Sequence, residues 1–311
     1  MKNVLVVGGA GAIGRSVIKF LLSEGKYDIT VLDIKGKKTY KRLKKYQKRI
    51  RIVYADMNEK SLIDDLVKEN LFIIYLAGNL PPLANINEEL MANNEYNSIK
   101  IITDSIKRFN PNCCLVYGSS TSVYDKEVEV SDDTKISSDK KDFYSLYKVK
   151  SEKYIMKNLK NYMILRIPYV LCDIDKDSMV YNVSYSDYIN TIYVDDLAFC
   201  IVAGLSKKKE FNKKTLLVNG GEKYNIYYKD LLIKILDSYG LTWSIFKSFF
   251  STDRSYVSPV IKDDKLNNLI NYREMGIKRY YTLLEDYKTS YRRLVPRLLA
   301  LPFKLLVKLK K

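Results

Sequence analysis

The sequence of 311 residues contains no histidine, which removes the commonest general base and a frequent metal ligand from consideration. Any acid–base chemistry must therefore use tyrosine, lysine, cysteine or a carboxylate, and we expect no metal site. The four cysteines, at positions 113, 114, 172 and 200, are too few and too scattered for a disulfide framework. Such cysteines are typical of small buried side chains in a reducing cytoplasm.

Long apolar runs are also absent, because none reaches the roughly 18 to 20 residues that a transmembrane helix needs. The first seven residues lead into a glycine motif and lack the cleavage site of a signal peptide. We therefore expect a cytoplasmic protein. The net charge of +17 is partly local, since residues 292–311 carry basic side chains and no acidic one.

The first two-thirds of the chain alternates short β-branched runs with longer amphipathic stretches. This alternation predicts an α/β fold with a doubly wound parallel (Rossmann) sheet covered by helices. The expected strands are Asn3–Val7, Asp28–Leu32, Ile50–Tyr54, Phe72–Leu76, Cys113–Tyr117 and Met163–Ile167. The expected helices are Ile13–Ser23, Ser61–Lys68, Glu88–Arg108, Phe143–Lys157 and Val194–Leu205.

Three glycines, Gly8, Gly11 and Gly14, join the first expected strand to the first expected helix. They allow a tight turn and a close approach of the backbone to a pyrophosphate. The helix N-terminus, with Ala12 and Ile13 in the turn, adds free N–H groups and the positive end of a dipole. Glycines alone also fit an ordinary turn, but the strand before them and the helix after them favour a dinucleotide site.

An acidic residue, Asp33, ends the second expected strand, nineteen residues after Gly14. A carboxylate there accepts hydrogen bonds from the adenosine ribose and repels a 2′-phosphate, so we expect NAD as the cofactor. Lys35, Lys37 and Lys38 would soften the discrimination against NADP if they faced the ribose. We favour the alternative that these lysines lie in a solvated loop.

The second candidate constellation is Tyr144 with Lys148 and Ser120. Tyr144 and Lys148 are four positions apart, which places both on one face of a helix. A free tyrosine has a pKa of about 10, and a neighbouring ammonium group lowers it toward the range of an efficient base. Ser120 ends a neighbouring strand, where it can hold a substrate oxygen. The alternative is an exposed helix face that carries this spacing by chance, since the chain has 27 tyrosines.

Further motifs occur in a consistent order: Asp56, residues 75–78 (Tyr-Leu-Ala-Gly), residues 119–124 (Ser-Ser-Thr-Ser-Val-Tyr), residues 193–198 (Tyr-Val-Asp-Asp-Leu-Ala) and residues 218–221 (Val-Asn-Gly-Gly). With the glycines and the tyrosine–lysine pair, they make about residues 1–285 resemble an extended short-chain dehydrogenase/reductase. The group that the sequence resembles is the NAD-dependent nucleotide-sugar epimerase/dehydratase family, in which homodimers are usual. A homodimer is therefore expected.

The resemblance implies roles for individual residues. Tyr144 would be the acid/base, Lys148 would also bind the nicotinamide ribose, and Ser120 would be the hydroxyl partner. Asn94 matches an asparagine that is frequent in the long helix, or is simply a residue on the helix surface. The cofactor would further contact Asp56, Met57, Leu76, Ala77 and Gly78.

The substrate side departs from the family pattern. Thr121 and Ser122 replace the acidic pair with which the dehydratases eliminate water, so we expect no dehydration. Tyr169 stands where the family has a substrate-contacting asparagine, and Ile189 replaces an arginine that grips the pyrophosphate. Arg254 would supply one diphosphate contact, or else is a surface ion-pair partner. Thr121, Tyr169 and Arg254 are our candidate substrate residues.

No linker separates the expected parts of the chain, which predicts interleaved lobes. We assign residues 1–167 and 191–218 to an NAD-binding Rossmann domain, and residues 168–190 and 219–291 to a smaller, partly helical substrate-binding lobe.

In the tail, residues 292–311, leucines line one side of a helix beside a basic sector. Such a helix favours peripheral contact with an anionic membrane at its inner face. The alternative is packing on the protein itself or on a dimer partner. Nucleic acid is not expected, because the basic side chains adjoin leucines rather than aromatic stacking platforms.

The combined features predict an enzyme for NAD-dependent oxidation or epimerisation of a nucleotide-activated sugar, in surface-glycan biosynthesis. One alternative is an NAD(P)H-dependent reductase of a nucleotide-linked keto-sugar. Another is an epimerase acting on a polyprenyl-diphosphate-linked sugar. A non-catalytic NAD-binding regulatory protein is a different class, which we disfavour because binding alone needs no activated tyrosine.

Overall fold

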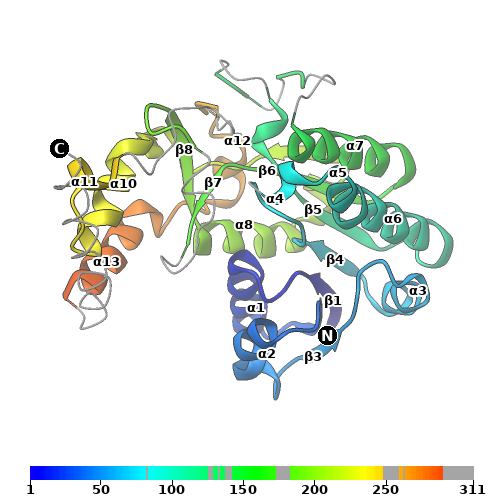
Figure 1. The fold of residues 1–311 in the computed structure, drawn as a ribbon. Helices are drawn as coiled ribbons and strands as arrows, with labels where there is room; N and C mark the ends of the chain where they lie inside the picture. Colours follow the sequence, from blue (N-terminus) through cyan, green and yellow to red (C-terminus); the bar gives the residue numbers. More distant parts are fainter. Residues whose placement is uncertain are drawn as a thin grey trace.

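A seven-stranded parallel sheet forms the centre of the molecule, in the strand order β3-β2-β1-β4-β5-β6-β9 (Figure 1). The computed structural model describes residues 1–81, 83–124, 129–131, 134–136, 142–172, 183–247, 259–261 and 263–289. The strands are β1 (Lys2–Val7), β2 (Tyr27–Asp33), β3 (Arg51–Tyr54), β4 (Phe72–Tyr75), β5 (Cys114–Ser120), β6 (Tyr162–Ile167) and β9 (Lys214–Leu217). The expected doubly wound α/β fold is thereby confirmed, and the six expected strands correspond to β1–β6.

The strand order reverses between β1 and β4. From β1 the chain moves outward to β2 and β3, then crosses back to β4 and continues outward to β5, β6 and β9. Helices therefore diverge on either side of this point and leave a crevice at the carboxyl ends of the strands. The fold alone thus favours a ligand site between β1 and β4.

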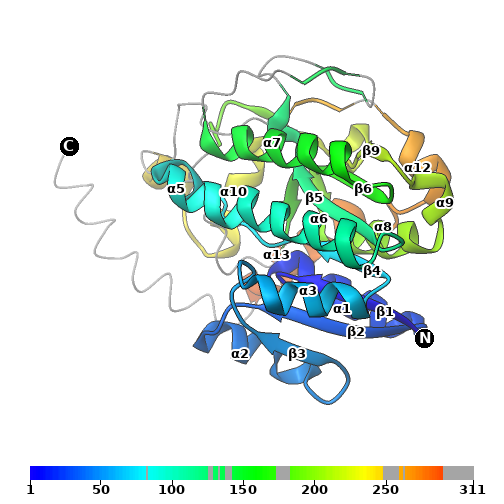
Figure 2. The same ribbon diagram turned by 90° about the vertical axis from the view of Figure 1, so that its right-hand side faces the viewer.

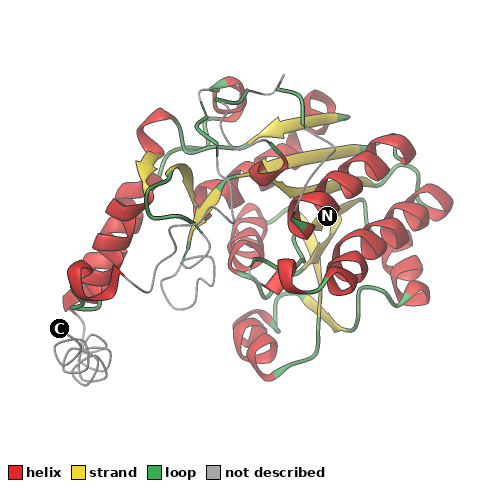
Figure 3. Cartoon of the chain, turned by 45° about the horizontal axis from the view of Figure 1, so that its top comes forward, coloured by secondary structure: helices red, strands yellow, loops and turns green. Residues whose placement is uncertain are grey.

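Helices cover both faces of the sheet, as Figures 2 and 3 show. Alternate residues of each strand face opposite sides, so Val4 and Val6 pack toward α1 and α8. Leu5 and Val7 pack in the opposite core, toward α3 and α6. Both sides of the central strands are consequently buried, which explains their nearly continuous apolar sequences. The main helices are α1 (Ala12–Glu24), α3 (Lys60–Glu69), α6 (Ser98–Phe109), α7 (Phe143–Asn158) and α8 (Val194–Ser206).

The long helix expected after β4 is divided into three parts. It begins as α5 (Glu88–Met91), continues as the π-helical turn η2 (Ala92–Asn97) and ends as α6. Asn87 caps the start of α5 by accepting a hydrogen bond from the Leu90 N–H at 2.9 Å. A π turn carries extra residues for the same rise and rotates the side chains that follow it. Regular helical spacing could not predict this rotation.

A smaller lobe is built around a second sheet, which the sequence patterns did not predict. Its strand order is β10-β8-β7, with β7 parallel and β10 antiparallel to β8. The lobe lies to the left of the main sheet in Figure 1. Its strands are β7 (Tyr169–Leu171), β8 (Tyr188–Tyr193) and β10 (Asn225–Tyr227), and its helices are α10 (Tyr228–Ser238), α11 (Trp243–Phe246) and α13 (Gly276–Thr289).

The chain passes repeatedly between the two parts. It leaves the main sheet after β6, returns through α8 and β9, and leaves again after residue 218. The Asp196 carboxylate on α8 accepts the N–H groups of Met275 at 2.9 Å and Gly276 at 2.7 Å, where α13 begins. Helix α12 (Lys265–Ile270) also packs on α8. Asp196 of the Asp-Asp motif therefore links α13 of the smaller lobe to α8 of the main domain.

One local expectation is wrong. Lys37 and Lys38 do not lie in a loop, because they begin the short helix α2 (Lys37–Leu43), which docks Leu43 in the core. Their side chains, like that of Lys35, are exposed to solvent as expected. The remaining short elements are α4 (Leu83–Ile86), α9 (Lys208–Phe211) and the 3₁₀ turns η1 (Lys44–Tyr46), η3 (Thr121–Val123) and η5 (Glu222–Tyr224).

The described ranges contain no helix with the length and apolar character to cross a bilayer. Cys113 and Cys114 are buried on opposite faces of the sheet, as adjacent strand positions require. Within the same ranges no group of three cysteine or carboxylate side chains is arranged to hold a metal ion. The tail, residues 292–311, lies outside the described residues.

Candidate active site

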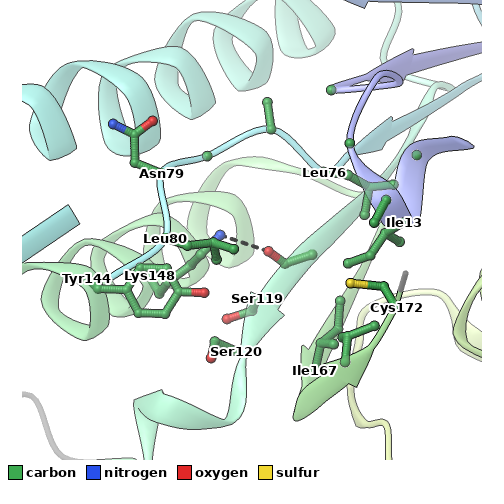
Figure 4. Close-up of a pocket in the computed structure, with 18 of the residues that line it drawn as sticks. Ile13, Leu76, Asn79, Leu80, Ser119, Ser120, Tyr144, Lys148, Ile167 and Cys172 are labelled. Carbon is green, nitrogen blue, oxygen red and sulfur yellow. Dashed lines mark hydrogen bonds between the residues drawn. The ribbon is translucent and has the colours of Figure 1, made fainter. Parts of the chain in front are cut away.

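A cavity of about 270 Å³ opens at the carboxyl ends of β1, β4, β5 and β6 (Figure 4). It lies at the reversal of strand order, where the fold favours a ligand. The predicted residues that line it are Gly8, Gly11, Ala12, Ile13, Gly14, Leu76, Ala77, Gly78, Ser120, Tyr144, Lys148 and Tyr169. Sequence reasoning missed Asn79, Leu80, Gly118, Ser119, Ile167, Pro168, Val170 and Cys172, which also line it.

The glycine turn forms one wall of the cavity. Gly8 has a φ of +84°, and a Cβ atom there would lie 2.7 Å from the backbone nitrogen of Ala77. A Cβ atom on Gly14 would lie 2.7 Å from the Cα of Gly9 and would also meet the Gly8 carbonyl oxygen. Gly11, which has no side chain, occupies the N-cap position of α1 and leaves the first N–H groups open. Gly8 and Gly14 therefore require glycine, and the open cradle fits a pyrophosphate.

Asp33 lies beside this turn at the end of β2. Its Oδ2 atom accepts the Ala10 N–H at 2.7 Å, and its Oδ1 atom accepts the Ile34 N–H at 2.8 Å. Burial raises the pKa of the Asp33 carboxyl, while the two N–H groups and the positive charge of Arg42 counteract that effect. Arg15 donates to the Ala10 carbonyl at 2.8 Å, so two arginines flank the expected ribose position. The sequence analysis did not single out Arg42, which lies in the unpredicted helix α2.

The two predicted adenine contacts follow β3, outside the cavity lining. Asp56 is exposed and accepts the N–H of Asn58 at 2.8 Å. The Met57 sulfur accepts the Tyr75 hydroxyl at 3.3 Å. The carbonyl oxygen of Asn94 lies 3.0 Å from the same hydroxyl oxygen and shares its one proton. Asn94 itself is half-buried and does not line the cavity, which favours its reading as a helix residue.

Tyr144 and Lys148 project into the cavity from successive turns of α7. Asp142 caps this helix by accepting the Ser145 N–H at 2.8 Å, and the Asn85 side chain accepts the Tyr144 N–H at 3.0 Å. Figure 4 shows the Tyr144 ring directed toward the end of β5, where Ser120 lies. The Lys148 ammonium donates to the Gly118 carbonyl at 2.9 Å, and both side chains are almost fully buried. The predicted trio therefore meets in one place.

The surroundings of Tyr144 oppose its ionisation in the ligand-free protein. Burial raises the pKa of the phenol, and the negative charges of Glu95 and Asp142 add to that effect. The hydrogen bond with Ser120 acts in the opposite direction and lowers the pKa. Ser120 is held in turn because its hydroxyl accepts the Ser122 N–H at 3.2 Å. The phenol thus needs a nearby positive charge to act as a base.

A carboxylate that the sequence analysis did not single out lies beneath the site. Glu95, in the π turn η2, is fully buried and its Oε2 atom is 3.0 Å from the Nζ of Lys148. The Tyr117 hydroxyl donates to its other oxygen. Regular helical spacing gave no signal for this arrangement, because the π turn determines which residues face inward.

Of the candidate substrate residues that the structure describes, Tyr169 lines the cavity and Thr121 does not. Tyr169 lines the cavity, with its hydroxyl 3.4 Å from that of Tyr228. Thr121 is buried next to Ser120 but does not line the cavity, which makes direct contact with a ligand there unfavourable. Ile189 is buried within β8. Arg254 lies outside the described residues.

The comparisons with other proteins agree with this geometry. A model of the 3-beta hydroxysteroid dehydrogenase/isomerase family matches residues 5–167. No sequence among the curated proteins matches the chain. Similar folds include UDP-glucuronic acid 4-epimerase from Bacillus cereus, solved with UDP-glucuronic acid and NAD. It has a TM-score of 0.72, 18% identity, and coverage of 91% of this chain and 99% of that one.

Two further solved structures are similar over comparable lengths. The UDP-Glc/GlcNAc 4-epimerase from Campylobacter jejuni has a TM-score of 0.70 and 16% identity, over 93% of this chain and 99% of that one. MoeE5 in complex with UDP-glucose and NAD has a TM-score of 0.72 and 15% identity, over 94% of this chain and 99% of that one. These likenesses show a shared fold.

Proposed function

The chain belongs to the 3-beta hydroxysteroid dehydrogenase/isomerase family, and we propose that it is an NAD-dependent enzyme that epimerises a nucleotide-activated sugar by oxidation and reduction. One observation carries the proposal: the glycine cradle and the Tyr144–Lys148 pair face the same cavity. The similar folds support the substrate class, because the Bacillus cereus structure was solved with UDP-glucuronic acid and NAD. We assign the reaction to surface-glycan biosynthesis.

The residues present fit NAD. Gly8, Gly11 and Gly14 leave the space that a pyrophosphate needs, and the N-terminus of α1 faces it. The Asp33 carboxylate would accept the ribose hydroxyls, and Lys148 would reach the nicotinamide ribose. Bound NAD supplies the acceptor and donor of hydride in such a site. The other residues that would hold it are Ala12, Ile13, Asp56, Met57, Leu76, Ala77 and Gly78.

Three side chains at the cavity would have different roles in the proton transfer. The Tyr144 phenolate takes the proton of the substrate hydroxyl, and the Ser120 hydroxyl holds the same oxygen in place. Lys148 stabilises the phenolate through its positive charge. Tyr144 returns the proton when the carbonyl is reduced again. Thr121 and Ser122 carry no carboxyl group, so this site lacks the acid for eliminating water.

We assign the substrate to the smaller lobe. Residues 1–167 and 191–218 would bind the cofactor, whereas residues 168–190 and 219–291 would bind the sugar nucleotide. Tyr169, at the start of β7, lines the cavity from this lobe together with Pro168, Val170 and Cys172. Arg254 remains a candidate contact for the diphosphate, whereas Thr121 does not line the cavity.

A lipid-linked sugar is the second candidate substrate. Leu80, at the cavity, is 49% exposed, and Leu83 and Ile86 of α4 are 53% and 74% exposed. Apolar side chains open to solvent beside a cavity favour a ligand with an apolar part. A polyprenyl diphosphate sugar combines such a part with the activated sugar.

The assembly and the location are proposed from the sequence resemblance and from the basic tail. We propose a homodimer in the cytoplasm that touches the inner face of an anionic membrane through residues 292–311. Sedimentation with anionic vesicles tests the membrane contact. The full chain should sediment with them, whereas a chain truncated after residue 291 should stay in the supernatant.

A substrate panel tests the activity. Purified protein is incubated with UDP-glucuronic acid, UDP-glucose, UDP-N-acetylglucosamine and a polyprenyl diphosphate sugar, with and without added NAD. Formation of an epimer without net cofactor reduction supports the proposal. Stoichiometric consumption of reduced cofactor with a keto-sugar would instead identify a reductase. The absence of turnover with the whole panel would contradict the substrate class.

A further inference from the structure

Glu95 lies directly behind the cavity wall, separated from the cavity by Gly78. A Cβ atom on Gly78 would lie 2.9 Å from the Oε2 atom of Glu95, so only this glycine lets the carboxylate approach so closely. Gly78 itself lines the cavity. The carboxylate is therefore adjacent to the proposed reaction site and yet shielded from solvent and ligand.

The contacts of Glu95 join it to the catalytic lysine. Its Oε2 atom is 3.0 Å from the Lys148 Nζ, and its Oε1 atom accepts the hydroxyl of Tyr117 on β5. Lys148 also donates to the Gly118 carbonyl at 2.9 Å. Among the described residues the Oε2 atom of Glu95 has no hydrogen-bond partner, so its contact with Lys148 is an ion pair without a directed hydrogen bond. The position of the ammonium is fixed from two sides, by η2 and by β5.

The side chain of Glu95 has no solvent exposure. Burial of a charged carboxylate destabilises the folded protein unless a positive charge lies beside it. Glu152, the other fully buried carboxylate on these elements, has a separate partner, because Arg166 donates to it at 2.8 Å. Lys148 is the positive charge that faces Glu95. Each charge offsets part of the other, and the phenol of Tyr144 lies close to Lys148 and senses the charge of Glu95.

We propose that Glu95 is a positioning residue of the proposed oxidoreductase site. It fixes the Lys148 ammonium and offsets part of its charge, and so it sets the pH at which Tyr144 acts as a base. The inference rests on the proposed function for the identity of the base. It concerns how that base is tuned and assigns no direct contact between Glu95 and the substrate.

The charged and titratable groups around Tyr144 and Glu95 determine the electrostatic field at the phenol. Tyr144 is faced by Lys148 and Asp142 from α7, by Glu95 from η2, and by Tyr169 and Cys172 across the cavity. Glu95 is faced by Tyr75 on β4 and by Tyr117 on β5, besides Lys148. Burial raises the pKa of each of these two tyrosines, and the charge of Glu95 adds to the effect. Both tyrosines therefore stay neutral, and the charge that opposes Lys148 comes from Glu95.

Two substitutions should move the ionisation of Tyr144 in opposite directions. Glu95→Gln removes the negative charge and frees the full charge of Lys148, so the Tyr144 pKa should fall by about one unit. Tyr117→Phe keeps the carboxylate but removes its hydrogen-bond donor, so the ion pair tightens and the pKa should rise by a smaller amount. A purely structural defect would lower activity in both variants without opposite shifts.

The ionisation of Tyr144 is measured by following phenolate absorbance against pH in the NAD-loaded protein. The same titration with Tyr144→Phe added is subtracted, for the wild-type protein and for each variant. Opposite shifts support the proposal, and shifts that are absent or equal in sign overturn it. If Glu95→Gln does not fold, the Tyr117→Phe titration decides alone, since a fall or no change overturns the proposal. The titration uses no substrate, so failure of the sugar panel would reject the proposed function without deciding this result.

The pH dependence of kcat/KM supplies a second readout once the panel identifies a substrate. The acidic limb for Glu95→Gln should move to lower pH by about one unit, which is about a tenfold gain in rate on that limb. The limb for Tyr117→Phe should move to higher pH. Unmoved limbs would overturn the proposal.

Discussion

The Nζ atom of Lys148 lies 5.8 Å from the centre of the Tyr144 ring, one turn of α7 away. Both side chains are almost completely buried, so their interaction is only weakly screened by water. We propose that at this separation the ammonium stabilises a Tyr144 phenolate without a proton passing between the two. The pair can therefore act as a single acid–base unit, on which the first two predictions depend.

Tyr144→Phe should lower kcat by at least about 100-fold, because it removes the only proposed proton acceptor and leaves the ring in place. The Kd for NAD should change by less than about twofold, as measured by calorimetry. Tyr147→Phe is the matched control, since the Tyr147 hydroxyl donates to Glu88 at 3.0 Å and does not line the cavity. Turnover retained by Tyr144→Phe would remove the proposed mechanism.

Oxidation of the substrate should accelerate as the pH rises. Burial raises the pKa of Tyr144, so the phenol is mainly protonated near neutral pH and the phenolate fraction grows with pH. We expect kcat/KM at saturating NAD to rise about tenfold per pH unit on its acidic limb. Reduction of the carbonyl needs the protonated phenol and should not show this limb. A profile for oxidation that is flat between about pH 6 and pH 9 would contradict a tyrosine base.

Gly14→Ala should abolish NAD binding, because the new Cβ atom would meet the backbone of Gly8 and Gly9 in the cradle. Backbone atoms cannot move aside as a flexible side chain can. Gly36→Ala is the control, since Gly36 is extended and its Cβ atom would meet only the Thr39 hydroxyl at 3.8 Å. Calorimetry with NAD and a thermal melt of each variant separate lost binding from lost folding. Normal NAD affinity in folded Gly14→Ala would place the dinucleotide elsewhere.

Asp33→Ala should reduce the preference for NAD over NADP by at least about tenfold. The substitution removes both the acceptor for the ribose hydroxyls and the charge that repels a 2′-phosphate, while Arg42 and Arg15 remain beside the site. Arg42→Ala should change the ratio in the opposite direction, because it removes a positive charge near Asp33. The ratio of the two dissociation constants is the measurement. If the ratio is unchanged in both variants, Asp33 and Arg42 do not determine the choice between NAD and NADP.

Local patterns predicted the parts of the molecule that local interactions determine. The strands β1–β6 follow from β-branched runs, and the glycine turn from backbone geometry that only glycine permits at Gly8 and Gly14. The α/β fold and the assignment to the extended short-chain dehydrogenase/reductase group are confirmed. The roles of Ser120, Tyr144 and Lys148 remain predictions, although the structure brings these residues together.

The features that were missed depend on long-range packing. Strands β7 and β10 are three residues long and pair only through tertiary contacts, so their alternation is too short to detect. Helix α2 is seven residues long and carries mostly basic side chains. Its two buried residues, Thr39 and Leu43, are too few to give a recognisable apolar pattern. Glu95 was missed because a π turn, and not regular helical spacing, directs it toward Lys148.

Isotope transfer tests the central claim most directly. The nucleotide sugar identified by the panel is prepared with deuterium on its ring carbons and converted in the presence of excess unlabelled NAD. If bound NAD takes hydride from one carbon and returns it to the same carbon, the epimer keeps all its deuterium, and Tyr144→Phe forms no epimer. Loss of one deuterium to solvent or to the cofactor pool, or an epimer formed by Tyr144→Phe, would contradict the account.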